Sequence, residues 1–187
     1  MNNLFLFFFT GLVNLSYSQD SLYVGKTWML PEVRRSICTR SGVVLAELEF
    51  QKEYGKIFDI IAQLIKSNIN VHFEIRNYTD SRGHDTANLS LSQYRANDWI
   101  KSLLNKGANP KQLVDLGFGE SMPRTVCLKD SIYYVSKPDE DEDIPILLSE
   151  EYIMSFHKKD KGIFDLLHLL NRRSELVVVL IDEIEKE

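Results

Sequence analysis

The spacing of apolar residues switches between the periods of a helix and of a strand several times along this chain. Residues 70–78 alternate apolar and polar side chains, which predicts a half-buried strand. Residues 54–66 place apolar side chains at helical spacing, and a second helix is predicted from residue 85 or 86 to Lys106, ending at Gly107. Strands that alternate with helices pack as a sheet covered by helices, so the sequence predicts a two-layer α/β sandwich.

The remaining predicted elements continue the same alternation. Residues 41–50 are rich in β-branched and apolar side chains and predict a first strand, and residues 113–118 predict a third. Residues 162–170 have the pattern of a helix, and the unbroken apolar run 176–181 fits a central strand covered on both faces. The predicted order is β-α-β-α-β-(insertion)-α-β, with the insertion at about residues 124–159.

The start of the chain has the order of parts found in a secretory signal peptide. An apolar run, Leu4–Val13, is followed by the stretch Ser16-Tyr17-Ser18 and then by Gln19. This run is shorter than the roughly 20 apolar residues that span a bilayer. We therefore expect residues 1–18 to be a cleaved signal peptide, with an uncleaved hydrophobic anchor as the alternative. Residues 19–40 are then interpreted as an N-terminal arm that precedes one domain at residues 41–183.

Charge and cysteine content narrow the partners and the chemistry. The formal net charge is −5 without clusters of lysine or arginine, which argues against nucleic acid or an anionic membrane surface as a partner. The acidic run Asp139–Asp143 is interpreted as a solvated loop; a calcium site is the alternative, although its oxygens fit no known loop spacing. Cys38 and Cys127 are either a disulfide of an oxidising compartment or two buried small hydrophobes.

One arginine interrupts the apolar face of the second predicted helix. Arg95 lies four residues from both Leu91 and Trp99, so it is expected on or beside their apolar stripe, where a guanidinium is costly unless paired. The nearest suitable anion is Asp80, at the carboxyl end of the preceding strand. The two residues form either a structural ion pair or a site for an amino-acid head group. In the second case the aspartate takes the ammonium and the arginine fork takes the carboxylate.

Several motifs around these two residues resemble those of OmpA-like peptidoglycan-binding domains. The family's patterns are T-D-x-x-G, N-x-x-L-S-x-x-R-A, G-[YF]-G-E-x-x-P and N-R-R-x-E. The corresponding residues here are, in order, Thr79-Asp80-Ser81-Arg82-Gly83, then Asn88, Leu91-Ser92 and Arg95-Ala96, then Gly117–Pro123, and finally Asn171–Glu175. The resemblance between the second and third of these patterns also includes Gly107. They cover roughly residues 41–181 with one interruption, and their order and separation make the resemblance specific.

The resemblance implies non-covalent binding of peptidoglycan. In this family the matching aspartate and arginine hold the diaminopimelate side chain of the stem peptide, which assigns Asp80 and Arg95 as ligand residues. Thr79 and Asn88 match motif positions that line the same site, and the Arg172-Arg173 pair is interpreted as better suited to helix carboxylates than to the ligand. The protein is expected to tether the cell wall to the outer envelope in the periplasm of a Gram-negative bacterium. A protein partner would attach it to the outer membrane.

Three features depart from the family pattern. Val43–Ala46 stands where the first strand usually carries an F-x-F-[DN]-type motif, Asn77-Tyr78 replaces a common histidine or glycine before T-D, and residues 124–159 are longer than usual. The altered first strand leaves an alternative open. In that alternative the OmpA-like fold is a structural or protein-interaction module that has lost peptidoglycan binding.

An enzyme is the main rival class of function. A peptidoglycan amidase or peptidase would need a set of His and Glu ligands for a metal, or a Cys–His pair. The four histidines show no H-x-x-x-H spacing and are interpreted as surface or capping residues: His72, His84, His157 and His168. The sequence therefore predicts a binding protein without catalytic residues, metal or cofactor.

Overall fold

The computed structural model describes residues 22–30, 43–129, 132–134 and 145–183. The predicted signal peptide, the acidic run at 139–143 and Cys38 lie outside these residues, so the predictions made for them stay predictions. The described chain divides into two compact units. The first, called here the sheet unit, contains the residues up to Arg76, residues 94–116 and those from Ser174 onward. The second, the insertion unit, contains residues 77–93 and 117–173.

The element order follows the predicted alternation of strands and helices. In chain order the elements are β1 (Thr27–Leu30), α1 (Val43–Ser67), β2 (Val71–Tyr78), α2 (Asp85–Asn105), the 3-10 helix η2 (Pro110–Gln112), β3 (Leu113–Gly119), β4 (Thr125–Lys129), β5 (Ile132–Tyr134), β6 (Pro145–Leu147), α3 (Glu150–Met154), α4 (Lys161–Asn171) and β7 (Arg173–Ile181).

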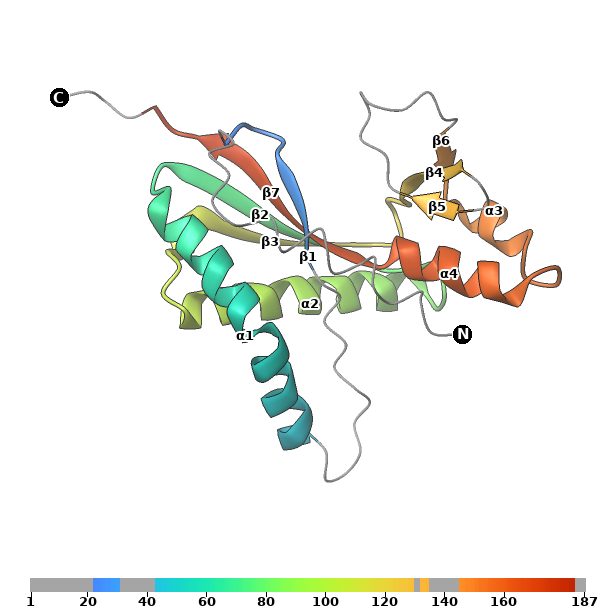
Figure 1. The fold of residues 1–187 in the computed structure, drawn as a ribbon, viewed down its shortest axis with the longest axis horizontal. Coiled ribbons are helices and arrows are strands. Elements are labelled where there is room, and N and C mark those ends of the chain that lie inside the picture. The colour runs from blue at the N-terminus through green and yellow to red at the C-terminus, as the bar shows by residue number, and fades with distance from the viewer. Residues whose placement is uncertain (1–21, 31–42, 130–131, 135–144, 184–187) are drawn as a thin grey trace. The chain divides into compact units, whose positions relative to one another are not determined.

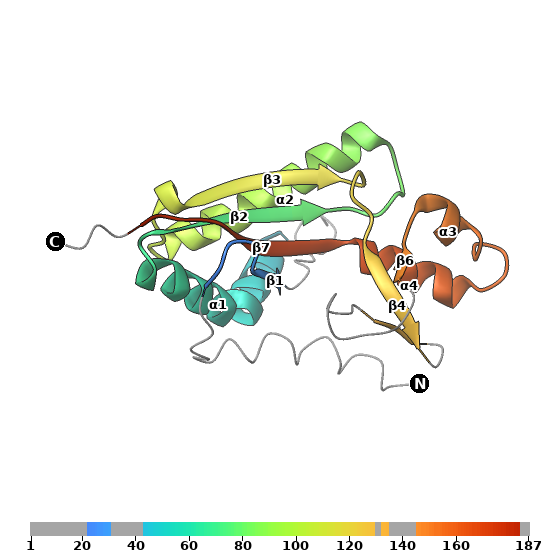
Figure 2. The same cartoon turned by 90° about the horizontal axis from the view of Figure 1, so that it is seen from above.

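The sheet unit is the two-layer α/β sandwich that the sequence predicts. Its four strands have the order β1-β7-β2-β3, and β1 runs antiparallel to β7, with Leu30 opposite Ser174. Helices α1 and α2 cover one face of this sheet (Figures 1 and 2). Along β2 the predicted alternation is confirmed, because Val71, Phe73 and Ile75 are buried while the residues between them are half-buried.

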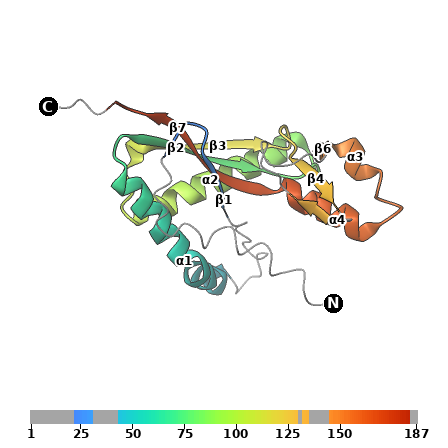
Figure 3. The ribbon, with the colours of Figure 1, turned by 45° about the horizontal axis from the view of Figure 1, so that its top comes forward.

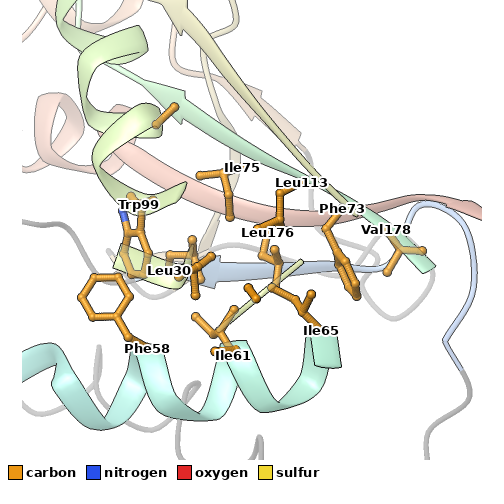
Figure 4. Packing of buried hydrophobic residues seen from close by; sticks show 14 of the residues in the cluster. Leu30, Phe58, Ile61, Ile65, Phe73, Ile75, Trp99, Leu113, Leu176 and Val178 are labelled. Carbon is orange, nitrogen blue, oxygen red and sulfur yellow. The ribbon is translucent and has the colours of Figure 1, made fainter. Parts of the chain in front are cut away.

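The core of the sheet unit lies between the helices and the sheet. Apolar side chains of α1 meet those of β2 and β7, as Figure 4 shows for Ile61, Ile65, Phe73 and Leu176. Phe58 of α1 and Trp99 of α2 pack ring to ring, with centroids 4.8 Å apart. Burying one side chain of this kind stabilises a fold by about 1.5–3 kcal/mol, so this cluster is what holds the two layers together.

The prediction of a first strand at residues 41–50 is wrong. Helix α1 begins at Val43 and continues without a break through the helix predicted at 54–66. After the two β-branched residues Val43 and Val44, the sequence Leu45-Ala46-Glu47-Leu48 consists of strong helix formers, and the helix continues through Gly55 without a proline to end it. The first strand is instead β1, within the stretch interpreted as an N-terminal arm.

Strand β7 is an inner strand, as the apolar run at 176–181 predicts. It pairs with β1 on one side and lies beside β2 on the other. Burial on both faces holds only for part of the run: Leu176, Val177 and Val178 are buried, whereas Leu180 is 49% exposed. The prediction is therefore confirmed for the position of the strand and wrong for the complete cover of its second half.

The insertion unit has a small apolar core of its own. Strands β4, β5 and β6 form an antiparallel sheet with the order β5-β4-β6, and α3 and α4 belong to the same unit (Figure 3). The buried cluster consists of Val126, Leu148, Ile153, Leu167 and Leu170. The described residues of the segment predicted as an insertion at 124–159 contain the short elements β4, β5, β6 and α3. Among the described helices of the chain, none is long and apolar enough to cross a membrane.

The side chain of Asn171, at the end of α4, forms hydrogen bonds to two other segments of the insertion unit. Its amide nitrogen donates to the carbonyl oxygen of Leu148 at 2.9 Å, and its amide oxygen accepts from the backbone N–H of Arg124 at 2.8 Å. Asp160 caps the other end of α4 by accepting from the N–H of Ile163. These bonds fix where α4 begins and ends, and therefore where the following Arg172 lies within this unit.

Cys127 is buried on β4, and the disulfide with Cys38 stays a prediction.

Candidate functional site

The loop that follows β2 holds Asp80 in a buried position. The backbone N–H of Thr79 donates to the carbonyl oxygen of Gly119 at 2.8 Å, and both Thr79 and Asp80 are 5% exposed. Gly83 has φ of 110°, in the left-handed region that glycine adopts readily, so the chain can turn from this loop into α2. In the motif T-D-S-R-G, Thr79 and Asp80 are therefore buried, whereas Arg82 and Gly83 are exposed.

The guanidinium of Arg82 grips the carboxylate of Asp80. Arg82 Nη2 lies 2.7 Å from Asp80 Oδ2, and Arg82 Nε lies 3.2 Å from each of the two carboxylate oxygens. The backbone N–H of Arg82 also donates to Asp80 Oδ1 at 3.1 Å. This fork geometry is the strong, charge-assisted kind of contact. The sequence interpretation gave Arg82 no role, although two residues of separation in a turn allow such a contact.

A second guanidinium approaches the same carboxylate from the end of α4. Arg172 Nη1 lies 3.7 Å from Asp80 Oδ2, and the side chain of Arg172 is only 26% exposed. The sequence interpretation favoured helix carboxylates as the partners of Arg172 and Arg173. The structure instead brings Arg172 to the aspartate of the T-D motif.

The surroundings of Asp80 hold it in the charged form. Burial raises the pKa of the Asp80 carboxyl, but the hydrogen bonds from Arg82 and the positive charge of its guanidinium outweigh burial and lower the pKa below its usual value. Asp80 is therefore an ionised carboxylate at neutral pH. A buried carboxylate in this form attracts cationic groups strongly.

Asn88, on the first turn of α2, positions the loop. Its amide nitrogen donates to the carbonyl oxygens of Asp80 at 3.2 Å and of Arg82 at 3.3 Å, and it also contacts the carboxylate of Glu120. These contacts act on the loop backbone around the site. Thr79 differs, because its hydroxyl oxygen is buried and has no hydrogen-bond partner within the described residues. A ligand could therefore use Thr79 directly, while Asn88 keeps Asp80 in place.

His168 is a buried histidine in α4, although the sequence interpretation placed it on the surface or at a cap. It is 1% exposed, and neither ring nitrogen has a hydrogen-bond partner among the residues that the structure describes. Its ring packs edge-on against that of Phe164, with centroids 4.5 Å apart. Burial lowers the pKa of the His168 imidazole, and the positive charges of Arg82 and Arg172 lower it further, while the charge of Asp80 opposes this.

Arg95 lies in the sheet unit, on the part of α2 that follows Gln93. It is half-buried beside Ala96 and close in the helix to Trp99, both of which are fully buried. Leu91 is 41% exposed, so the prediction that it belongs to the core stripe is wrong. Arg95 and Asp80 thus belong to different units of the chain, and their pairing stays a prediction.

The glycines of the Gly117-Phe118-Gly119 motif allow β3 to pack closely against the start of α2. A Cβ atom on Gly117 would lie 2.2 Å from the backbone nitrogen of Gln93, a distance that no side chain tolerates. The N–H of Gly119 donates to the hydroxyl of Ser92 at 2.8 Å, and Gly117 N–H donates to the side chain of Gln93 at 2.9 Å. The motif therefore fixes the loop that supports Thr79 from the β3 side.

Comparison with known proteins agrees with this reading of the motifs. Residues 46–131 match the model of the OmpA family. A curated relative is the peptidoglycan-associated lipoprotein of Buchnera aphidicola, which is 29% identical over 85 residues, 46% of this chain and 49% of that protein. The chain thus spans about half the length of the relative it matches.

Residues 46–131 form an OmpA-family domain.

Two solved structures are similar at low identity. The peptidoglycan-associated lipoprotein from Burkholderia pseudomallei is 23% identical, with 68% of this chain and 79% of that chain covered and a TM-score of 0.44. The periplasmic domain of Helicobacter pylori MotB is 18% identical, with 88% and 82% covered and a TM-score of 0.45.

The OmpA-family match contains some residues of the candidate site and leaves others out. Asp80, Arg82 and Asn88 lie inside residues 46–131, whereas His168 and Arg172 follow the insertion and lie beyond it. His168 had little signal in the sequence, because Phe164 is the single apolar residue three or four positions away from it in the helix. Arg172 had a signal of another kind, because it belongs to the N-R-R-x-E motif at Asn171–Glu175, but that motif did not identify Asp80 as its partner.

Proposed function

We propose that this protein binds peptidoglycan non-covalently through the diaminopimelate of the stem peptide, and so tethers the cell wall to the outer envelope. The observation that carries the proposal is the buried, ionised carboxylate of Asp80 at the end of β2 in the T-D motif of an OmpA-family domain. The curated relative and one of the similar structures are both named peptidoglycan-associated lipoproteins.

The chemistry of the proposed ligand matches the charges around Asp80. Diaminopimelate carries an amino group and a carboxyl group at the end of its side chain, so it needs both a carboxylate and a guanidinium. Asp80 would accept from the ammonium, and Arg95 would hold the ligand carboxylate with two parallel hydrogen bonds. Arg172 places a further positive charge 3.7 Å from Asp80, and the hydroxyl of Thr79 offers an additional hydrogen bond.

The proposed place of action follows from the ligand and from the first residues of the sequence. A protein that binds peptidoglycan must reach the periplasm, and residues 1–18 would direct its export as a cleaved signal peptide. Attachment to the outer membrane would come from an envelope protein as partner. N-terminal sequencing of the mature protein tests the export step: we expect it to begin at or near Gln19, and an intact Met1 in the cytosolic fraction would contradict export.

Binding to purified sacculi tests the function itself. Asp80→Asn keeps the size of the side chain and removes its charge, so we expect it to abolish co-sedimentation with sacculi. Truncation of one partner of a buried charged contact costs about 2–5 kcal/mol of binding free energy. Asp59→Asn is the matched control, because it makes the same change at a side chain that is 60% exposed on α1. Circular dichroism of both variants checks that the fold is retained.

The same experiment distinguishes the alternative function. The structure offers one observation in favour of a module that does not bind peptidoglycan: the Asp80 carboxylate is already engaged by Arg82. If wild-type protein fails to co-sediment with sacculi while its fold is intact, the peptidoglycan assignment is refuted and the alternative of a protein-interaction module is supported.

A further inference from the structure

Helix α4 contains a buried histidine, His168, that the proposed contacts to the ligand do not use. The side chain is 1% exposed, and within the described part of the chain neither ring nitrogen has a hydrogen-bond partner. Buried polar groups in folded proteins are nearly always hydrogen-bonded, because an unmade hydrogen bond costs free energy. Packing alone therefore does not account for an imidazole at this position.

The end of α4 connects this ring to the carboxylate of Asp80. His168 lies one helical turn before Arg172, whose backbone N–H donates to the carbonyl oxygen of His168 at 3.4 Å. Arg172 Nη1 in turn lies 3.7 Å from Asp80 Oδ2. All three residues belong to the insertion unit, so the ring and the carboxylate are parts of one packed unit.

Charged groups act on the ring from two elements, the loop after β2 and α4 itself. Among the described residues they are Asp80, Arg82, Asp165 and Arg172. A further titratable side chain, that of His157, packs on Phe164, which packs in turn on His168. His157 therefore contacts the ring only through an uncharged side chain.

The two carboxylates differ in how strongly they act on the ring. The side chain of Asp165 is 50% exposed and pairs with Lys161 at 3.3 Å, so solvent and the lysine screen its charge. The side chain of Asp80 is 7% exposed. Burial lowers the pKa of the His168 imidazole, and Asp80 is the neighbouring charge that opposes this most. A proton on His168 therefore depends on the negative charge of Asp80.

The ammonium of the proposed ligand depends on the same negative charge. Arg82 and Arg172 already lie beside this carboxylate, so a protonated His168 and a bound ammonium would add two more cations around it. We propose that His168 couples ligand binding to pH: a protonated imidazole and a bound diaminopimelate ammonium oppose each other across Asp80, so the site releases peptidoglycan on acidification. This inference rests on the proposed function.

The direction of the pH dependence follows from the neutral form of the ring. The ligand binds best while His168 is uncharged, and the affinity is then constant above the ordinary histidine pKa of 6.5. The pKa of His168 in the folded protein lies below this value, so the affinity falls as the pH drops through that lowered pKa. The pKa of Asp80 is lowered from 3.8, so Asp80 keeps its charge throughout this range.

Titration calorimetry at pH 7 and pH 5, with a stem tripeptide that ends in meso-diaminopimelate, tests the coupling. At an effective dielectric constant of about 20, a unit charge within roughly 10 Å changes an affinity about tenfold. Because the lowered pKa leaves His168 only partly protonated at pH 5, we expect wild type to bind about fivefold more weakly there than at pH 7. His168→Phe keeps a ring beside Phe164 and cannot take up a proton, so its affinity should be the same at both pH values.

Two controls accompany this comparison. His84→Gln removes an exposed histidine from the loop between Asp80 and α2, and we expect it to keep the pH dependence of wild type. Thermal unfolding at both pH values checks that each protein is folded, and His168→Gln replaces His168→Phe if the latter does not fold. Changes in the charge of the peptide itself are common to all variants.

The possible results separate the two proposals. If wild type binds equally well at both pH values, or if His168→Phe keeps the loss of affinity at pH 5, the coupling is refuted and the proposed function stands. Loss of the pH dependence in His84→Gln would also refute it, since the proton would then be taken up in the loop. If wild type binds neither the tripeptide nor sacculi at pH 7, both proposals fail together.

A second measurement examines the coupling without any ligand. Proton NMR of the imidazole follows the titration of His168 in wild type and in Asp80→Asn. Because the charge of Asp80 raises the pKa of His168 against the effect of burial, we expect that pKa to fall in the variant. An unchanged pKa would show that the two groups do not share a charge, and it would overturn the inference.

Discussion

The guanidinium of Arg173 lies flat over the ring of Tyr78, with its central carbon 3.6 Å from the ring centroid. Tyr78 also stacks on Phe118, with ring centroids 5.1 Å apart. Tyr78 directly precedes the T-D motif, and Arg173 directly follows Arg172 in the sequence. The stack therefore joins the chain on both sides of the Asp80–Arg172 contact, and it sets where the second guanidinium of the site lies.

Replacement of Tyr78 by leucine tests the role of this stack. Cation–π contacts contribute about 0.5–2 kcal/mol and aromatic pairs about 0.5–1.5 kcal/mol, so we expect the free energy of unfolding to fall by about 2 kcal/mol. Peptidoglycan binding should weaken as well, because Arg172 loses its support. Urea denaturation and sacculus co-sedimentation measure the two effects. The control is Tyr94→Leu, at a tyrosine that is 52% exposed, and an equal loss of stability there would contradict the prediction.

The close packing of β3 on α2 gives a prediction about two glycines. Gly117→Ala would push a Cβ atom to 2.2 Å from the backbone of Gln93. Because neither backbone can yield easily, we expect a loss of stability of about 3 kcal/mol or more. Gly55→Ala is the opposite case, since nothing lies within 4 Å of its Cβ position in α1. There we expect a gain of about 0.5–1 kcal/mol from better helix propensity. Thermal unfolding of both variants decides, and a tolerated Gly117→Ala would refute this packing.

Buried His168 makes stability depend on pH on the acidic side. Its pKa in the folded protein lies below the ordinary value of 6.5, so the unfolded chain binds a proton more readily than the folded chain does. Stability is unaffected above the unfolded pKa and falls as the pH drops below about 6.5. We expect His168→Phe, which keeps an aromatic ring beside Phe164, to reduce this loss between pH 7.5 and 5.5.

Guanidinium denaturation at the two pH values measures the effect. His84→Gln serves as the comparison, because His84 is exposed in the loop before α2, and it should retain the pH dependence of wild type. If His168→Phe loses stability with falling pH as steeply as wild type does, another group is responsible and the assignment to His168 is wrong.

The sequence predicted those elements whose pattern is local. Strand β2 and helices α2 and α4 have clear periods of two or 3.6, and these periods depend only on neighbouring residues. Strand β1 could not be found in this way, because it has only four residues and is held by pairing with β7 at the other end of the chain. The first turns of α1 were predicted as a strand because Val43 and Val44 are β-branched, and this local preference is overridden by the helix formers that follow them.

The candidate site was predictable to the extent that a motif names its residues. Asp80 and Thr79 come from the T-D pattern, and the structure shows both to be buried at the end of β2. The Arg82 contact depends on the conformation of one loop, which spacing alone does not determine. The approach of Arg172 depends on where α4 ends, and this is fixed by the hydrogen bonds of Asn171 far along the sequence. Long-range contacts of this kind leave no periodic trace.

The final prediction concerns the shape of the charge at Arg95. If Arg95 is only a structural ion-pair partner, Arg95→Lys should keep most of the stability, and binding should not change. If it grips the ligand carboxylate through two parallel hydrogen bonds, lysine supplies a point charge without the planar fork. We predict the second result: near-native thermal unfolding, with affinity for the diaminopimelate-containing peptide reduced at least about tenfold, or roughly 1.4 kcal/mol.

A second Arg→Lys substitution, at an arginine that is not assigned to the ligand, controls for effects that any such replacement would have. Arg76→Lys makes the same change in the sheet unit, where Arg76 pairs with Glu74 at 2.7 Å on β2. That pair is partly exposed, so we expect its replacement to alter the stability by less than about 1 kcal/mol and the affinity not at all. Titration calorimetry of both variants gives the comparison. Lysine cannot form the two parallel hydrogen bonds that the arginine guanidinium forms with a carboxylate. If the Arg95→Lys protein binds the peptide as tightly as wild type does, the proposed bidentate contact is refuted.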